Sequence, residues 1–245
     1  MIALLQLRQL LAGTLLVGIA TTSTDDLAQS LSEARRTYDL DAAVELRVVV
    51  GESLQTSPSP KLVRLLADVC LLEAELRRIE FESLHEAQRA ERRELGALID
   101  EAAGEGLARL AALTELDSDG LRLQADLLGT LIRSKFRGRK YRRDMESAAQ
   151  RALDLDPRNA LALVSLAKPY VFHPGRSEDD LRIGLEFLDR ALVIDSGLES
   201  ALLLRGRAFA EIGKVDEAIA DWQRALDRNP DCEPARSLLE QYGGP

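Results

Sequence analysis

The chain has 245 residues and a formal net charge of −9, and aromatic residues make up only 4% of it. Because a polyanion repels an acidic surface over about one Debye length, roughly 8 Å, this charge argues against non-specific nucleic-acid binding by the whole molecule, and we expect no sequence-specific nucleic-acid partner. Helix-forming residues dominate and runs of β-branched residues are scarce, so the composition predicts an all-α fold in one elongated unit.

Residue types that carry chemistry are few and scattered. Cys70 and Cys232 lie far apart and follow no metal or redox spacing, so both are expected to be free thiols. His85 and His173 form no helix-borne pair that could hold zinc. The sequence contains no nucleophile elbow, phosphate-binding loop or dinucleotide glycine motif. We therefore expect no catalytic residue, no metal site and no cofactor, which argues against an enzyme.

Residues 1–24 predict a signal peptide or a membrane-proximal helix. An apolar run over residues 10–20 follows one positive charge and ends in Gly18-Ile19-Ala20, a small-x-small pattern that signal peptidase could cut. The run is shorter than the about 20 apolar residues that a membrane span needs. A cleaved signal, an uncleaved anchor and an ordinary first helix are the alternatives. We expect an exported, periplasmic protein or membrane association through the N-terminus, with a cytoplasmic protein as the alternative.

Two helical hairpins are predicted next. Residues 25–58 look like a degenerate hairpin, and residues 59–118 like a longer one that contains a charged stretch over residues 73–94. Pairs such as Glu73 with Arg77, four residues apart, support an exposed helix. We therefore expect the helices of the second hairpin to project, either as solvated helices or as an arm that binds a partner.

Residues 119–230 repeat at a nearly fixed period. Positions predicted to end a second helix follow one another at intervals of 39, 39 and 34 residues, and they are Ser118, Pro157, Ser196 and Pro230. Random sequence seldom keeps such a register, so three helical hairpins are predicted here. The first helix of the earliest of these three hairpins is placed by Ala125, Leu128, Gly129 and Ile132.

The last repeat carries the most complete pattern, which consists of Leu202, Gly206, Phe209, Gly213, Ala218, Trp222, Ala225 and Pro230. Small residues let two antiparallel helices approach closely, aromatic residues fill the space between units, and proline ends the second helix. This set resembles the tetratricopeptide repeat (TPR) family. The resemblance implies a right-handed superhelical solenoid of four to five helical hairpins, with residues 231–245 as a capping helix and tail.

The resemblance also implies a function, namely a non-enzymatic scaffold or adaptor that binds a partner protein or peptide on a concave face lined by the first helices. Carried over one position at a time, that face is expected to present Arg64, Asp68, Thr130, Arg133, Val164, Lys168, Val171, Leu203 and Arg207. This mixture suits a peptide that carries apolar anchors and acidic groups. The alternative is that these side chains pack between helices or are solvated.

A basic segment departs from the repeat pattern. Residues 133–143 contain seven basic residues and are expected to straddle the turn between two helices, where cations meet the negative end of the first helix dipole. The dipole accounts for two or three of these charges, so we expect either a solvated turn or a patch that recognises an acidic protein segment, anionic lipid or nucleic acid. The patch consists of Lys135, Arg137, Arg139, Lys140, Arg142 and Arg143.

A second departure is a lengthened turn expected between Lys168 and Asp180, with Pro169, Pro174 and Gly175 in it. It is similar to the turns of some exported bacterial TPR proteins that accompany transporters. The alternative function is therefore a periplasmic small-ligand-binding or transporter-associated TPR protein. An enclosed cavity of several hundred Å³ would favour that carrier, and an open groove would favour a peptide.

Overall fold

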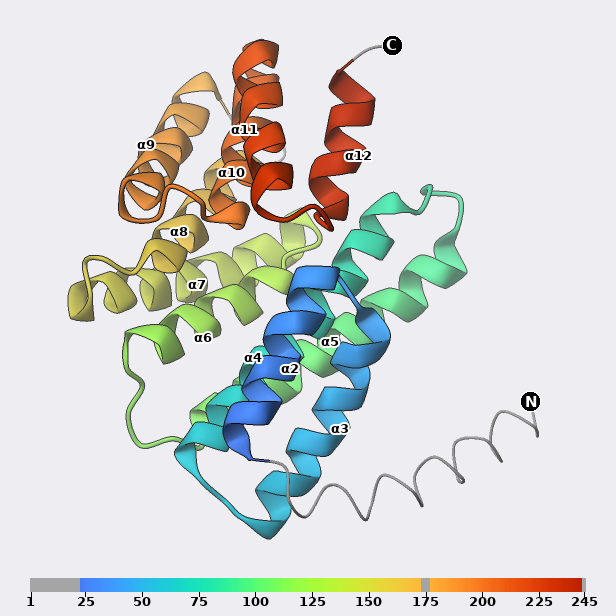
Figure 1. The fold of residues 1–245 in the computed structure, drawn as a ribbon, viewed down its shortest axis with the longest axis vertical. Helices are drawn as coiled ribbons and strands as arrows, with labels where there is room; N and C mark the ends of the chain where they lie inside the picture. Colours follow the sequence, from blue (N-terminus) through green and yellow to red (C-terminus); the bar gives the residue numbers. More distant parts are fainter. Residues whose placement is uncertain (1–22, 173–176, 244–245) are drawn as a thin grey trace.

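The computed structural model describes residues 23–172 and 177–243, and within these ranges it consists of helices joined by short turns, without a strand (Figure 1). The expected all-α solenoid of helical hairpins is confirmed. The segment 1–22, with its predicted signal peptide, and residues 173–176 of the predicted long turn lie outside the described residues. The prediction that this turn begins at Lys168 was wrong, because residues 168–172, with Pro169 among them, still belong to the helix Ala160–Phe172. The helices are α2 (Thr24–Thr37), α3 (Leu40–Thr56), α4 (Pro60–Ser83), α5 (Arg89–Ala111), α6 (Ser118–Thr130), α7 (Lys135–Leu155), α8 (Ala160–Phe172), α9 (Glu178–Ile194), α10 (Glu199–Glu211), α11 (Val215–Arg228) and α12 (Glu233–Tyr242).

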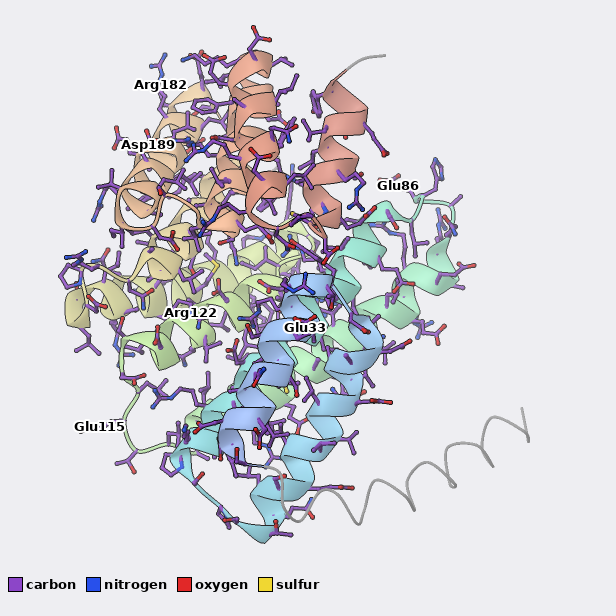
Figure 2. All side chains as sticks on the ribbon, viewed as in Figure 1. Glu33, Glu86, Glu115, Arg122, Arg182 and Asp189 are labelled. Carbon is purple, nitrogen blue, oxygen red and sulfur yellow. The ribbon has the colours of Figure 1, made fainter. Side chains whose placement is uncertain are left out.

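Consecutive helices pair as hairpins, namely α2 with α3, α4 with α5, α6 with α7, α8 with α9 and α10 with α11, and α12 packs on α11 as the last helix. Charged side chains are spread over the helix surfaces, for example Glu33 on α2 and Arg182 and Asp189 on α9 (Figure 2). Among the described helices, none combines the length and the apolar character that a membrane span requires.

Helix starts are fixed by short polar side chains. The Asp117 carboxylate accepts the backbone N–H of Gly120 at 2.9 Å before α6. Ser134 caps α7 in the same way, and Ser177 forms a capping box at the start of α9. Such caps satisfy backbone donors that have no partner inside the helix, so they decide where each hairpin turns.

The register of the repeats is set by α6, α8 and α10, each of which is 13 residues long. The prediction that Ser118 follows the end of a helix was wrong, because Asp117 caps the start of α6, as Asn159 does at the start of α8. The repeat positions predicted for α6 were therefore assigned to residues one helical turn too far toward the C-terminus. The residues that correspond to Leu202, Gly206 and Phe209 are Leu121, Ala125 and Leu128.

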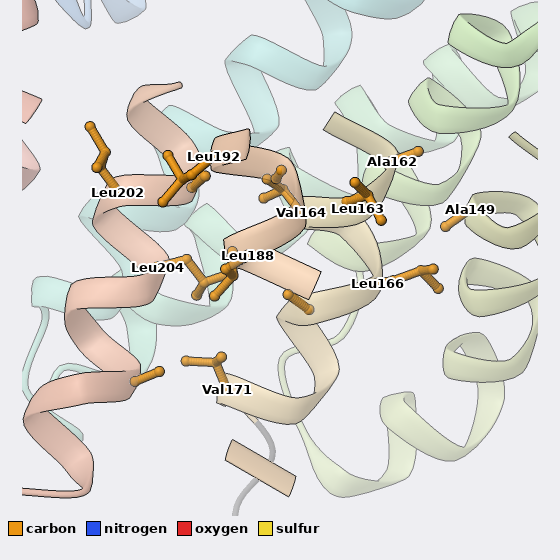
Figure 3. Close-up of a cluster of buried hydrophobic side chains, with 14 of the residues drawn as sticks. Ala149, Ala162, Leu163, Val164, Leu166, Val171, Leu188, Leu192, Leu202 and Leu204 are labelled. Carbon is orange, nitrogen blue, oxygen red and sulfur yellow. The ribbon is translucent and has the colours of Figure 1, made fainter. Parts of the chain in front are cut away.

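Apolar side chains form two clusters that meet at α6. Leu121 and Ala125 belong to the cluster of the C-terminal helices, whereas Leu123 and Leu127, on the other side of α6, belong to the cluster of α2–α5. Figure 3 shows part of the C-terminal cluster around Leu188. The two ends of the chain therefore share one helix but bury most of their apolar surface separately.

The α4–α5 hairpin differs from its prediction at its base. Glu73, which was expected on an exposed helix, is only 1% exposed. Its carboxylate pairs with Arg77 at 2.9 Å and lies 3.2 Å from the guanidinium of Arg47 on α3. The interpretation of Glu73 as a surface charge was wrong because α4 stays buried as far as Leu76. Partner binding by the remaining charged stretch stays a prediction.

Candidate functional site

The first helices of the hairpins form the inner face of the stack. Contacts between successive first helices (α4 with α6, α6 with α8, α8 with α10) are extensive, whereas successive second helices barely touch, so the stack curves with its first helices inside. The ninth residue of each of these four helices is charged, and these residues are Asp68, Asp126, Lys168 and Arg207. Two acids followed by two bases allow neighbouring side chains to pair across the inner face.

Asp126 lies at the centre of the inner face and is almost completely buried. Its carboxylate accepts hydrogen bonds from Ser165 Oγ and Lys168 Nζ, both at 2.8 Å, and lies 3.6 Å from the guanidinium of Arg122. Burial opposes ionisation of Asp126, but Lys168 and Arg122 outweigh it and hold the pKa of Asp126 below its ordinary value. Lys168 also lies 3.6 Å from Glu75. The central part of the inner face therefore satisfies its own charges.

The C-terminal end of α2 reaches across the inner face. Arg35 Nη2 donates to Asp68 Oδ1 at 2.7 Å on α4. Tyr38, directly after α2, contacts the C-terminal helices. Its hydroxyl is hydrogen-bonded to Glu199 and lies 3.4 Å from Cys232 Sγ. Tyr38 has a backbone φ of +56°, which is uncommon outside glycine. Tyr38 is the C-cap of α2, and its backbone N–H donates to the carbonyl oxygens of Ala34 and Arg35.

A second set of contacts fastens the same end of α2 to the turn before α12. Asn229 Nδ2 donates to the backbone oxygen of Arg36 at 3.0 Å and to Glu199 at 2.7 Å, and Arg36 pairs with Asp231. Arg36 lies more than 190 positions before both Asn229 and Asp231 in the sequence. The N-terminal hairpin therefore closes the inner face between α4 and α10 from within the chain.

Beyond this closure, an open pocket of about 350 Å³ remains between α8, α10, α11 and α12. Phe172, Arg207, Trp222 and Tyr242 line it, with the rings of Trp222 and Tyr242 5.2 Å apart, and the polar side chains of Glu211 and Gln241 also belong to its lining. Arg78 and Arg207 lie over the Phe172 ring at 5.9 and 5.6 Å from its centre. No carboxylate pairs with Arg207 among the residues that the structure describes. The pocket can accept an apolar group beside a cation.

The basic segment begins in the turn, at Arg133 and Ser134, as predicted, but the rest of it lies in the first half of α7 and none of it at the negative end of α6. Residues 131–134 make the turn, and the cations of residues 135–143 follow in α7, where Lys135 and Arg137, in the first turn, meet the positive end of the helix dipole, which disfavours them. Two of them are paired: Arg137 makes bonds of 2.7 and 2.6 Å to Asp100, and Arg142 pairs with Glu146 at 2.7 Å.

The other four cations of this segment have no ion-pair partner within the described part of the chain. Lys135, Arg139 and Arg143 are exposed, and the ammonium of Lys140 lies 4.7 Å from the centre of the Tyr141 ring. Phe136, between them, is 72% exposed. An exposed aromatic ring is thus surrounded by unpaired positive charge.

No family model and no curated protein matches the sequence. Among solved structures, TTC0263, described as a thermophilic TPR protein in Thermus thermophilus, superposes with a TM-score of 0.57 at 15% identity, over 88% of this chain and 98% of that one. The chain has a tetratricopeptide-repeat fold. YrrB, described as a TPR protein with an unusual peptide-binding site, gives a TM-score of 0.42 at 13% identity, covering 89% of this chain and 100% of that one. MamA superposes with a TM-score of 0.39 at 16% identity, over 91% of this chain and 96% of that one. The last two superpositions are too loose to support an argument about this chain.

The TPR fold places most of the predicted face residues in contacts within the chain. Arg64 pairs with Asp117, Asp68 with Arg35 and Lys168 with Asp126. Val164 and Val171 are buried, and Leu203 packs against the core from a half-buried position. Arg207 is the predicted face residue that borders the open pocket together with Val171.

Thr130 and Arg133 lie one turn beyond the TPR inner face, because the register predicted for α6 was wrong. The Thr130 hydroxyl donates to the backbone oxygen of Leu127 at 2.8 Å, and Arg133 binds Gly96 O and Asp100 at 2.9 and 2.8 Å. The residues that occupy the face instead are Arg122 and Asp126. Counting from the capping aspartate before α6 would have found them.

The residues with potential reactivity are few in this TPR fold. Cys70 and Cys232 are both free and buried. Within the described ranges, no group of three or more histidine, cysteine, aspartate or glutamate side chains could hold a metal ion. The exposed groups at the two candidate sites are Phe172, Glu211 and Tyr242 beside Arg207, and Phe136 with its neighbouring cations on α7.

Proposed function

We propose that this protein is a non-enzymatic scaffold that binds a partner protein or peptide at the open C-terminal end of its inner face. The observation that supports this most directly is the pocket beside Arg207, because it joins aromatic side chains to a cation that has no ion-pair partner among the described residues. The rest of the inner face, between α4 and α8, pairs its charges internally and is crossed by α2. A partner would therefore meet preformed chemistry only at the C-terminal end.

The partner chemistry follows from the lining of the pocket. A volume of about 350 Å³ is at the lower end of the range for small-molecule sites, and it suits one bulky apolar or aromatic side chain. Arg207 would pair with a carboxylate next to that side chain, since a guanidinium binds carboxylates through a planar fork. We expect a segment with an aromatic or large aliphatic residue beside an acidic one. A rigid helical surface limits the ordering cost of such binding.

The carrier alternative requires an enclosed cavity, and the described pocket is open to solvent. It is therefore shaped more like the end of a groove than like a ligand chamber. Native mass spectrometry after gentle purification tests the alternative, and a co-purifying small molecule would support it.

A random-peptide display selection tests the proposed site. The full chain is the bait, and the variants are Arg207→Gln and, as matched control, Arg190→Gln. Arg190 also lies over a phenylalanine ring, Phe187, at 5.8 Å, but on the outer helix α9. We expect enriched peptides to pair a bulky apolar residue with an acidic one, and to bind at least tenfold more weakly to Arg207→Gln only. Equal loss in both variants, or no enrichment by the native chain, would contradict the proposal.

A further inference from the structure

The first half of α7 exposes one continuous basic face. At 100° per residue, Lys135, Phe136, Arg139, Lys140 and Arg143 fall within an arc of about 140° on the helix. All five are exposed, whereas Met145, on the opposite side of the same helix, is buried. We call this arc the basic face of α7.

Folding does not account for the charges on the basic face of α7. The helix dipole stabilises none of these cations, and it is unfavourable for Lys135 in the first turn of α7. The neighbouring cations Arg137 and Arg142 are neutralised by Asp100 and Glu146, but no described carboxylate pairs with the four cations of the basic face. They are concentrated on a chain whose net charge is −9. A positive surface of this kind on an acidic protein is suited to a specific anionic partner.

We propose that the basic face of α7 docks on an anionic lipid surface. Four basic residues on one helix are within the range that binds acidic headgroups, and they act through the negative potential of the membrane surface. Phe136, 72% exposed in their midst, can insert its ring at the level of the headgroups. The face is a single exposed helix, whereas peptides are usually recognised in a groove or along a sheet edge. The open pocket of this protein lies elsewhere, at α8–α12.

This docking is independent of the proposed peptide site, because the two surfaces share no residue. A membrane-bound protein could therefore still present the pocket at Arg207 to a partner. The inference adds a second contact to the N-terminal membrane association predicted from the sequence, and it depends on residues of α7 alone.

Vesicle co-sedimentation of the full chain tests the proposal. The vesicles are phosphatidylcholine alone, or an equimolar mixture of phosphatidylcholine and phosphatidylglycerol. The test variant replaces Lys135, Arg139, Lys140 and Arg143 by glutamine. The control makes the same change at four exposed arginines outside the face, Arg151, Arg158, Arg182 and Arg190. A Phe136→Ala variant tests the ring separately. Circular dichroism verifies that every variant is folded.

The native chain should bind the mixed vesicles, and the binding should fade as salt rises. Since each cation near such a surface contributes about fivefold in affinity, the test variant should bind more than a hundredfold more weakly. The control should keep most of the binding, and Phe136→Ala should lose several-fold. Equal binding to both kinds of vesicle, equal loss in test and control variants, or no binding by the native chain would overturn the proposal. Stronger salt-sensitive binding to polyglutamate or to duplex DNA than to the vesicles would also overturn it.

Discussion

In the C-terminal hairpin, α10 and α11 meet where Gly206 faces Trp222, and a Cβ added to that glycine would lie 2.3 Å from Trp222 Nε1. In the long α4–α5 hairpin, the close contact is made by Gly106, whose added Cβ would meet Leu127 at 2.9 Å and Cys70 at 3.1 Å. Both regions use a glycine to bring helices together. They differ in what the glycine meets, since Gly206 faces an aromatic ring and Gly106 faces Leu127 and Cys70. Each hairpin also buries a paired carboxylate, Asp221 with Arg205 in the first and Glu73 with Arg77 in the second.

The difference extends to the inner face. Around α4 and α6, charged side chains of the inner face form ion pairs within the chain, as Asp126 does with Lys168. The end of α2 lies over them, where Arg35 bonds to Asp68. Around α10 and α12, packing is aromatic and the inner face ends in an open pocket. The comparison shows that a repeat stack loses binding surface where it neutralises its own charges. The region that is most regular is also the one that leaves space for a partner.

The largest expected effect concerns the aromatic packing of the C-terminal region. Trp222 is fully buried, so Trp222→Ala should cost about 3–5 kcal/mol of unfolding free energy, because it leaves a large cavity. Leu66→Ala, also at a fully buried site but in the N-terminal region, should cost about 2–5 kcal/mol. Urea unfolding followed by circular dichroism measures both.

Trp222 is the only tryptophan of the chain, so the native protein can be used to test whether the two regions unfold together. Its fluorescence reports on the C-terminal region, whereas circular dichroism reports on all helices. Coincident transitions would mean that the two regions unfold as one unit through α6. A loss below about 1 kcal/mol for Trp222→Ala would show that the aromatic contact does not hold the hairpin together.

The next effect concerns the buried charges of the central inner face. Asp126→Asn removes the charge that balances Lys168 and Arg122, so we expect a loss of about 3 kcal/mol, at the lower end of the range because Lys168 is partly exposed. Asp144→Asn, an exposed aspartate on α7, is the control and should stay within about 0.5 kcal/mol. Similar losses in the two variants would contradict this account.

The same pair predicts an acid response. Because the pKa of Asp126 is lowered in the folded chain, its contribution is complete above the unfolded aspartate pKa of about 3.9 and is lost as the pH falls through the lower folded value. Asp126→Asn should therefore lose less stability than the native chain between neutral and acid pH. Thermal unfolding at a series of pH values measures this difference.

An alkaline effect of intermediate size is expected in the N-terminal region. Burial raises the pKa of the Cys70 thiol to about 12, from an ordinary value of 9.0. The stabilisation is complete below pH 9 and is lost as the pH rises towards the folded value, because only the unfolded thiol ionises there. The slope from this group should be about 1.4 kcal/mol per pH unit. Cys70→Ala should unfold with a shallower pH dependence above pH 9, and equal slopes would refute the assignment.

The two regions also differed in how far the sequence predicted them. The last repeats were placed correctly in outline because their signals are local, such as Trp222 opposite Gly206 and Pro230 after the end of α11. The register of α6 was missed because an aspartate that caps a helix looks the same in sequence as one that ends a helix. Asp117 and Asp156 are such a pair.

Other features could not be predicted because they depend on residues far apart in the chain. The closure of the inner face by α2 joins Tyr38 to Glu199, 161 positions away, and no local pattern marks such a pair. Glu73 was misread for the same reason, since its partner Arg47 comes from another hairpin. Which inner-face residues stay available to a partner follows from these contacts, and so the predicted face was broader than the pocket that remains.

The smallest expected effect tests the closure that links the two regions. Tyr38→Phe removes the hydroxyl that bonds to Glu199 and Cys232 but keeps the ring, which packs against both apolar clusters. We expect a loss of about 1 kcal/mol, the usual contribution of one hydrogen bond, because Asn229 still holds Glu199. Tyr170→Phe is the matched control, since no hydrogen bond of its hydroxyl is found within the described residues.

Hydrogen exchange gives a local readout, in which the amides of α2 should exchange several-fold faster in Tyr38→Phe while those of α10 and α11 stay unchanged. Such a result would mean that α2 can leave the inner face without unfolding the C-terminal repeats. Uniformly faster exchange in all helices would show instead that the closure is part of the same cooperative unit, and that the inner face between α4 and α10 opens only when the whole chain unfolds.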